Sequence, residues 1–210
     1  MEISKEYSSN VFINCPFDKE YKAIFESIVF TIHDCGFIAR CAKEEDNSGD
    51  VRIHKIFRII NECKFGIHDI SKADLDSITG LARFNMPLEL GIFLACQHYS
   101  NSKSFNKEKK SLIMDIENFR YQIFMSDLSG QDIKSHNNKI ELVIQNVRDF
   151  LVTNSKRTSI AGGEYIYNRY LVFKKDLPLL CYKIHKDCNT LTFIEYCDIV
   201  SMWIKSKTIS

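Results

Sequence analysis

Residues 11–41, VFINCPFDKEYKAIFESIVFTIHDCGFIARC, decide the fold class, because they contain a strand, a helix and a second strand in succession. The run 11–15 is rich in β-branched and aromatic residues, and Pro16 ends it. Apolar residues then recur at helical spacing up to Gly36, which stands where a C-terminal cap is expected. Residues 37–41 are the second predicted strand. Such a unit predicts two parallel strands joined by a right-handed crossover.

The same alternation of strand and helix continues as far as residue 152. Asp18 is placed to cap the first helix, and Asn85 is placed to cap a later one. The sequence therefore predicts an α/β protein, a flavodoxin- or Rossmann-like three-layer sandwich with a four- to five-stranded parallel sheet. The further predicted elements are helices over 51–63, 85–99 and 138–152, strands over 65–70 and 111–116, and a weak fifth strand near Ile133.

The composition changes beyond Leu151, where a polar segment ends in a Gly-Gly pair at 162–163, which indicates a linker. Two more helices follow, and the second opens with TFIE at 192–195, which fits a capping box. We therefore predict a nucleotide-binding α/β domain over residues 1–155 and a helical C-terminal extension over 156–210. Aromatic residues of this extension are expected to pack against the main domain or against a second copy of the chain.

Charge and hydropathy exclude several classes of protein. Lys and Arg number 28 against 27 Asp and Glu, so no strong field favours direct binding of nucleic acid or anionic lipid. A small basic cluster at 107–110 is expected to be a solvated loop before a strand. No apolar run approaches the roughly 18 residues of a membrane span, and residues 1–6 lack the apolar region of a signal peptide. We expect a cytoplasmic protein without membrane contact.

The cysteines predict buried thiols and no metal centre. None of the eight forms a CxxC pair, and most stand in apolar segments, where a free thiol behaves as a small hydrophobe. A zinc site formed by Cys181, His185, Cys188 and Cys197 is the alternative, but its spacing fits no standard pattern. We therefore expect that the protein requires no metal or other cofactor. The cysteines stand at positions 15, 35, 41, 63, 96, 181, 188 and 197.

Candidate ligand-binding residues follow from the predicted sheet, because open parallel sheets bind ligands beyond the carboxyl ends of their strands. This rule selects the loop 14–18, the acidic loop 44–50, Asp69 and Ser71 after the third strand, and the start of the helix at residue 85. Arg40 ends the second strand and is a candidate for a phosphate contact. Arg83 and Asn85 are candidates for the same role on the other side.

The helix that contains MPLELGIFLAC, residues 86–96, has one charge in an otherwise apolar run, and that charge is Glu89. A lone carboxylate in apolar surroundings is costly unless it is paired or faces a cavity. In the first turn, the helix dipole would stabilise it, and Gly91 would let a ligand or another backbone come close. The alternative is that Glu89 only caps the helix.

A carboxylate in such a pocket suits cleavage of a glycosidic bond. The transition state resembles an oxocarbenium ion, which a fixed anion beside the anomeric carbon stabilises or attacks. We predict Glu89 as that anion and Asp69 as the second polar group. Asp69 as a helix- or loop-capping residue is the alternative.

Three short motifs resemble nucleoside 2-deoxyribosyltransferases and bacterial TIR-like NAD-cleaving domains: VFINCPF at 11–17, HDIS at 68–71 and NMPLELGIFLA at 85–95. The resemblance covers roughly residues 11–150. It implies that Glu89 is the family's catalytic glutamate, and that the protein acts on NAD or a nucleotide as a small antiphage or nucleotide-signalling effector. The loop that it assigns to the base consists of Asn14, Cys15, Pro16 and Phe17.

Three hypotheses remain open from the sequence. The first is an enzyme that cleaves or transfers the N-glycosidic bond of NAD or another nucleotide, with Phe17 stacked on the base and Asn14 orienting the sugar. The second is a module that binds a nucleotide signal without cutting it and acts through oligomerisation. The third is a scaffold that assembles through its aromatic C-terminal helices. A homo-oligomer is expected in each case.

Overall fold

The computed structural model describes residues 6–73, 75 and 80–208, and its centre is one sheet of five parallel strands in the order β2-β1-β3-β4-β5. The prediction of an α/β fold with a four- to five-stranded parallel sheet is confirmed. The strands are β1 (Asn10–Asn14), β2 (Ile38–Arg40), β3 (Phe65–Asp69), β4 (Lys110–Asp115) and β5 (Lys134–Ser135). The helices are α1 (Lys22–Asp34), α2 (Arg52–Asn61), α3 (Asn85–Tyr99), α4 (Ile140–Ser155), α5 (Gly163–Lys183) and α6 (Phe193–Thr208), and three 3-10 turns are η1 (Phe105–Glu108), η2 (Arg120–Ile123) and η3 (Ser126–Leu128).

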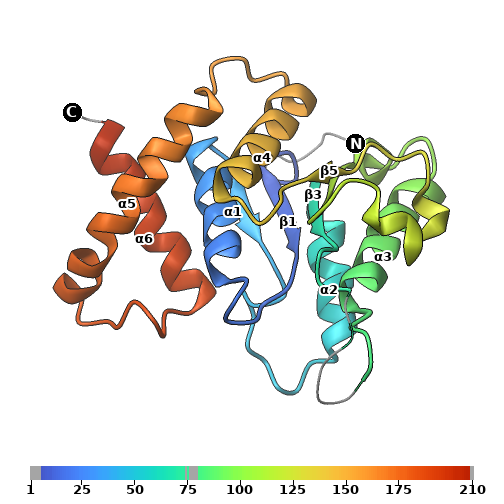
Figure 1. Ribbon diagram of the computed structural model, residues 1–210, viewed down its shortest axis with the longest axis horizontal. Coiled ribbons are helices and arrows are strands. Elements are labelled where there is room, and N and C mark those ends of the chain that lie inside the picture. Colours follow the sequence, from blue (N-terminus) through green and yellow to red (C-terminus); the bar gives the residue numbers. More distant parts are fainter. Residues whose placement is uncertain (1–5, 74, 76–79, 209–210) are drawn as a thin grey trace.

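Helices cover both faces of the sheet (Figure 1). Because side chains alternate along a strand, neighbouring residues of β1 enter different layers. Val11 and Ile13 pack in the cluster that contains α1 and α4, whereas Phe12 packs with α2 and α3. All five residues of β1 and all five of β3 are buried. These two strands therefore lie inside the sheet, and their side chains contribute to a separate hydrophobic core on each of its faces.

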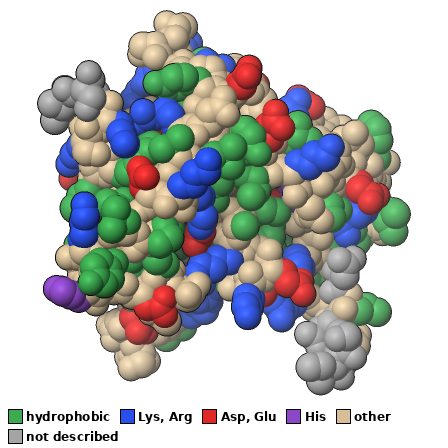
Figure 2. Space-filling model, turned by 60° about the vertical axis from the view of Figure 1, so that its left-hand side comes forward, with side chains coloured by type: hydrophobic (Ala, Val, Ile, Leu, Met, Phe, Trp, Pro, Cys, Tyr) green, Lys and Arg blue, Asp and Glu red, His purple; other side chains and the backbone are tan. Residues whose placement is uncertain are grey.

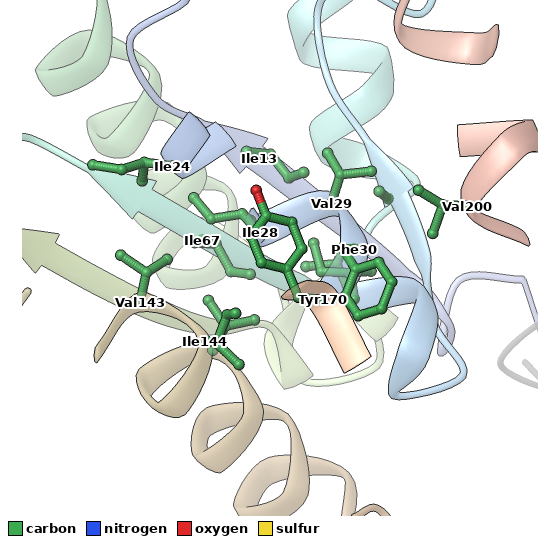
Figure 3. Packing of buried hydrophobic residues seen from close by; sticks show 14 of the residues in the cluster. Ile13, Ile24, Ile28, Val29, Phe30, Ile67, Val143, Ile144, Tyr170 and Val200 are labelled. Carbon is green, nitrogen blue, oxygen red and sulfur yellow. The ribbon is translucent and has the colours of Figure 1, made fainter. Parts of the chain in front are cut away.

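The C-terminal helices share the main core and add a layer outside α1 and α4 (Figure 1). Phe30 of α1 lies 5.4 Å from Tyr170, 5.2 Å from Phe173 and 5.8 Å from Trp203, measured between ring centroids. Figure 3 shows Phe30, Tyr170 and Val200 in one cluster with side chains of the sheet. The expected packing of the aromatic residues against the main domain is thus confirmed for Tyr170 and Phe173, and residues 156–208 form no separate core.

Local rules explain how several helices begin and end. Gly36 ends α1 in the left-handed region with φ of +76°, as expected for a C-terminal cap. Thr192 and Glu195 exchange backbone and side-chain hydrogen bonds at the start of α6, which confirms the predicted capping box. Asp18 accepts from the backbone N–H of Tyr21, the residue directly before α1, but the helix has no side-chain cap, so the prediction that Asp18 caps it is wrong. Asn85 is the first residue of α3 and does not cap it, so that prediction is wrong.

The basic cluster at 107–110 is not a solvated loop, because Lys109 is fully buried. Its ammonium donates to the carbonyl oxygens of Ile60, at 2.5 Å, and of Cys63, where α2 ends. The carbonyl oxygen of Ile60 also accepts from the backbone N–H of Cys63 at 3.2 Å, so the ammonium adds a second donor there and complements the helix dipole. Burial lowers the pKa of Lys109 to about 8. The prediction of a solvated loop is therefore wrong for Lys109, because a solvated loop and a buried cap have the same local composition.

Gly66 in β3 marks a close approach between strand and helix. A Cβ atom at this position would lie 2.6 Å from Nε2 of His68 and 2.8 Å from the ring of Phe93. Both rings are buried, and Phe93 belongs to α3. A glycine is therefore needed for α3 to pack against β3 at this distance.

All eight cysteines are free thiols, and five of them are buried. Among the described residues, no three His, Cys, Asp or Glu side chains gather as a metal site would need. The described helices also include none that is both long and apolar enough to cross a membrane.

Candidate functional site

A cavity of about 260 Å³ opens where β1 ends and α3 begins. This is the edge that the parallel topology selects for ligands. Seven of the ten predicted site residues line it, and Asp18, Arg52 and Met86 complete the lining. The seven are Asn14, Cys15, Pro16, Phe17, Arg83, Asn85 and Glu89.

Glu89 lies at the base of this cavity and is only 6% exposed. Burial raises the pKa of its carboxyl group to about 7, and the positive charge of Arg52 opposes that rise. Among the described residues, no side chain or backbone group forms a hydrogen bond or ion pair with this carboxylate. A buried acid with such a pKa can serve as a nucleophile or hold a cationic centre near neutral pH.

The helical period of α3 explains why Glu89 faces inward. Met86, Glu89, Leu90 and Phe93 recur every three or four residues and are the buried residues of this helix. Glu89 lies in the second turn, so its expected stabilisation by the helix dipole in the first turn is wrong. Gly91 is exposed on the opposite side, with nothing within 4 Å of the place where a Cβ would stand. It therefore does not open space beside Glu89.

Asn14 ties the end of β1 to the first turn of α3. Its Nδ2 donates to the carbonyl oxygen of Met86 at 2.8 Å and to Nδ1 of His68 at 3.1 Å. Burial, with a smaller contribution from the charge of Lys109, lowers the pKa of His68 to about 3, so the imidazole is neutral and carries its proton on Nε2. Both bonds use the amide nitrogen of Asn14, so its oxygen is the atom that this side chain can offer to a ligand. These contacts fix Glu89 relative to the sheet.

Phe17 forms the side of the cavity that was predicted to receive a base. Its ring meets Phe25 edge to face, with centroids 5.3 Å apart and an interplanar angle of 87°. Nζ of Lys43 lies 4.5 Å from the centroid of the same ring. Such a cation over an aromatic face is an attractive contact. The ring is therefore held from two sides, although it is only partly buried.

Asp69 and Ser71 do not line the cavity. Asp69 is fully buried and accepts from the hydroxyl of Tyr21 at 2.5 Å and from the backbone N–H of Ser71 at 2.8 Å. Nε2 of His136 lies 3.0 Å from its Oδ2. The reason for this placement is strand alternation: Asp69 shares the face of Ile67, towards α1 and α4, whereas Glu89 belongs to a helix on the other face. The structure thus gives Asp69 a capping role in the loop after β3, which was the alternative interpretation.

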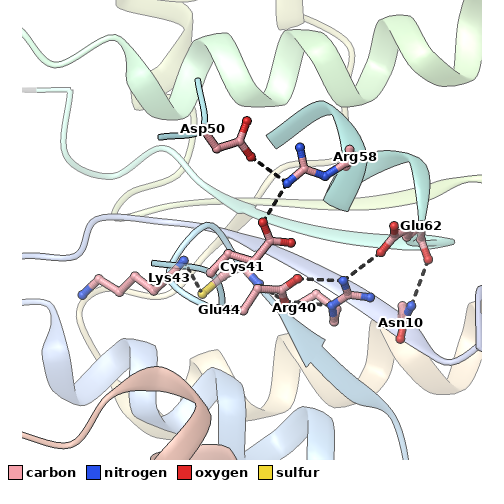
Figure 4. Close-up of polar contacts among 9 residues, drawn as sticks. Asn10, Arg40, Cys41, Lys43, Glu44, Asp50, Arg58 and Glu62 are labelled. Atoms are coloured by element: carbon pink, nitrogen blue, oxygen red, sulfur yellow. Dashed lines mark hydrogen bonds and ion pairs between the residues drawn. The ribbon is translucent and has the colours of Figure 1, made fainter. Parts of the chain in front are cut away.

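Arg40 also lies outside the cavity lining. Its guanidinium forms two hydrogen bonds with Glu44, at 2.8 and 2.7 Å, and one with Glu62 at 2.8 Å (Figure 4). Hydrogen bonds to Glu44 are the largest influence that raises the pKa of Arg40. These ion pairs link β2 to the end of α2. They occupy the guanidinium of Arg40, so the structure does not support the expected phosphate contact there. Glu44 and Glu62 stand 4 and 22 residues further along the chain than Arg40, and no pattern in the sequence indicates that they pair with it.

Two cations at the mouth of the cavity remain candidates for a phosphate. Arg83 was predicted, whereas Arg52 was missed because it was taken only as part of a helix. Arg52 is the first residue of α2 and is exposed. The loop 44–50 before it had been selected by the strand-end rule, so extending that loop by two residues would have included Arg52. Asp18 lies 3.9 Å from Arg83 and 3.6 Å from Lys72, measured between charged atoms.

Comparisons with protein-family models, with curated proteins and with solved structures found no match for this chain. The chemistry of the cavity is therefore inferred from its own residues.

Proposed function

We propose that this protein cleaves or transfers the N-glycosidic bond of NAD or another nucleotide, with Glu89 as the catalytic carboxylate. The observation that carries the proposal is an acid that is 6% exposed, faces a cavity of about 260 Å³ and has a pKa of about 7. Such a costly arrangement is typical of a site that stabilises a positive charge during a reaction. The motif resemblance described above supports the same assignment.

In the proposed reaction the bond between C1′ of the sugar and the base nitrogen breaks, and its electron pair leaves with the base. The carboxylate of Glu89 stabilises the resulting ribosyl cation or bonds to C1′. Water or an acceptor hydroxyl then adds to C1′, breaks the bond to Glu89 where one has formed, and releases its proton to solvent. Asn14 presents its amide oxygen to the sugar, and Phe17 flanks the base. Asp69 acts only by positioning the loop after β3.

The lining favours a base that leaves without a proton. Asp18 and Glu89 are its two carboxylates, and Asp18 is within 3.6 Å of Lys72. Glu89 must be ionised to stabilise the cation, so no second free acid of the described lining is present to protonate a departing base. A positively charged nicotinamide needs no such proton, and NAD therefore suits this site better than a neutral nucleoside.

The alternative is that the cavity binds a nucleotide signal without cutting it. The specific observation in its favour is that Asp69, the expected second catalytic group, is separated from Glu89 by the sheet. A homo-oligomer is proposed for either function, because hydrophobic side chains are exposed among basic ones on the face that carries α5 and α6 (Figure 2). The cytoplasmic, antiphage setting belongs to the same proposal and rests on the resemblance alone.

The test is incubation of the full chain with NAD and a panel of nucleotides and nucleosides, followed by quantification of the free base. We expect turnover by the wild type, loss of about a hundredfold or more with Glu89→Gln, and no change with Glu117→Gln, an exposed acid that does not line the cavity. Equal turnover by the wild type and Glu89→Gln would refute the catalytic role. Saturable binding with the ligand recovered intact would establish the alternative.

A further inference from the structure

A second and larger cavity, of about 730 Å³, adjoins the cavity of Glu89 and shares Phe17, Asp18 and Arg52 with it. It lies between the loops that follow β1 and β2 and the segment 189–193, which leads into α6. Figure 1 shows the start of α6 beside the loop that joins β1 to α1. Ligand sites usually measure about 300–1,000 Å³, a range that the larger cavity meets and the smaller one does not.

The charges around this larger cavity, here called the chamber, favour an anionic ligand. Three of its four carboxylates are paired with cations from outside the chamber lining: Glu26 with Lys174, Glu45 with Arg58 and Asp18 with Lys72. The fourth carboxylate is Asp46.

The cations of the chamber are less compensated. Lys22 lies 3.8 Å from Glu26, and Lys55 donates to the backbone oxygen of Glu45. The other three cations, Lys19, Lys43 and Arg52, form no ion pair with a carboxylate of the described chain. The lining therefore has a surplus of positive charge, which attracts phosphate groups. Figure 4 shows the side chain of Lys43 extending away from the ion pairs around it.

The floor of the chamber is aromatic. Phe17, Phe25, Phe193 and Tyr196 line it, and the rings of Phe25 and Phe193 lie 5.9 Å apart at an angle of 35°. Apolar rings beneath a rim of cations provide both a surface for a flat base and partners for phosphates. Lys43 connects the rim of cations to the aromatic floor, because its ammonium lies over the ring of Phe17.

The outer wall of the chamber is held in place by several contacts. Nζ of Lys22 donates to the carbonyl oxygen of Asn189 at 3.2 Å, and Phe193 packs against Phe25. Thr192 and Glu195 cap α6 reciprocally. The segment 189–193 is thus a fixed part of the chamber, contributed by the C-terminal region that was predicted to be an appendage.

We propose that the segment 189–193 completes a binding chamber for the remote half of a dinucleotide. The base and ribose that react lie at Glu89, the phosphates pass the shared wall at Arg52, and the second base lies on the aromatic floor beneath Lys43. This inference rests on the proposed function and narrows its substrate from nucleotides in general to dinucleotides. It assigns the C-terminal helices a role in substrate selection.

The test compares NAD with nicotinamide mononucleotide, which has the reacting half only. Binding is measured by calorimetry on the full-length Glu89→Gln protein, which keeps the ligand intact, and kcat/KM is measured on proteins that retain Glu89. Two variants change the chamber, Lys43→Glu by reversing a charge and Leu191→Trp by filling its space. The matched control is Lys110→Glu, which alters an exposed lysine at the amino end of β4.

We expect NAD to bind about tenfold or more tightly than the mononucleotide, since each charge-assisted phosphate contact contributes on that scale. Lys43→Glu and Leu191→Trp lower this preference, whereas Lys110→Glu keeps it. Equal affinity for both ligands, or a preference that neither chamber variant reduces, overturns the inference. Cleavage of the mononucleotide with the same efficiency as NAD would overturn it while leaving the proposed function intact. If NAD binds tightly and selectively but neither the wild type nor any variant cleaves it, the proposed function is refuted and the chamber is supported as a dinucleotide-binding site.

Discussion

Replacement of Glu89 by glutamine is expected to stabilise the protein above neutral pH. The folded protein holds the proton of this carboxyl group more tightly than the unfolded chain does, because burial raises the pKa from 4.5 to about 7. As the pH rises between these two values, the unfolded chain releases its proton first, so the folded state becomes less stable relative to it. Below pH 4.5 the cost is absent, and above pH 7 it is complete.

The size of this effect follows from the same two values. A gap of about 2.5 in pKa corresponds to about 3 kcal/mol, at about 1.4 kcal/mol for each pKa unit. Glutamine has nearly the same shape and carries no charge at any pH, so it avoids the cost. We therefore expect Glu89→Gln and the wild type to differ by less than about 1 kcal/mol at pH 5, and the variant to be more stable by about 3 kcal/mol at pH 8.

Urea unfolding of the wild type, Glu89→Gln and Glu117→Gln at pH 5 and pH 8 measures this difference. The Glu117→Gln control removes an exposed acid and should show no comparable dependence on pH. The reasoning is refuted if Glu89→Gln gains no stability over the wild type between pH 5 and pH 8. That result would mean that the carboxylate is well solvated or paired in the folded protein.

Three further predictions concern other residues. Lys109→Met is expected to cost about 2–5 kcal/mol in chemical unfolding, because two backbone carbonyl oxygens lose the buried ammonium that donates to them, whereas Lys110→Met should stay within about 0.5 kcal/mol; equal effects would contradict the buried cap. Gly66→Ala should lower stability by about 1–3 kcal/mol, since its methyl group meets two buried rings, and an unchanged melting temperature would contradict that packing. Arg52→Ala removes the charge that lowers the pKa of Glu89, so the acid limb of the pH–rate profile should move to higher pH; a limb that stays in place would show that the two residues are not coupled.

Much of the fold could be predicted because buried parallel strands are short, continuous apolar runs separated by helical periods. The strand-end rule also brought Asn14, Phe17, Arg83 and Glu89 to one cavity, since the carboxyl ends of parallel strands meet at one edge of the sheet. That rule depends on chain direction and strand order only. It needs no knowledge of how individual side chains pack.

The features that were missed depend on which face a side chain occupies. Asp69 comes directly after His68 in β3, and this one step moves its side chain to the opposite face of the sheet from Glu89. Two steps along α3 likewise place Gly91 away from Glu89. Lys109 differs from its neighbours only because the chain turns it towards the end of α2. Such placements require the packing of helices on the sheet, which no local pattern contains.

Glu89 is a buried acid that forms no ion pair with the described residues, and its titration shows whether the folded protein holds it in that state. The measurement is carbon NMR of the side-chain carboxyl groups in protein labelled at glutamate, recorded from pH 4 to pH 9, with Glu89→Gln identifying the resonance. We expect one glutamate signal, missing from the variant, to titrate near pH 7. If the signal that disappears in Glu89→Gln titrates near the ordinary value of 4.5, the account is contradicted.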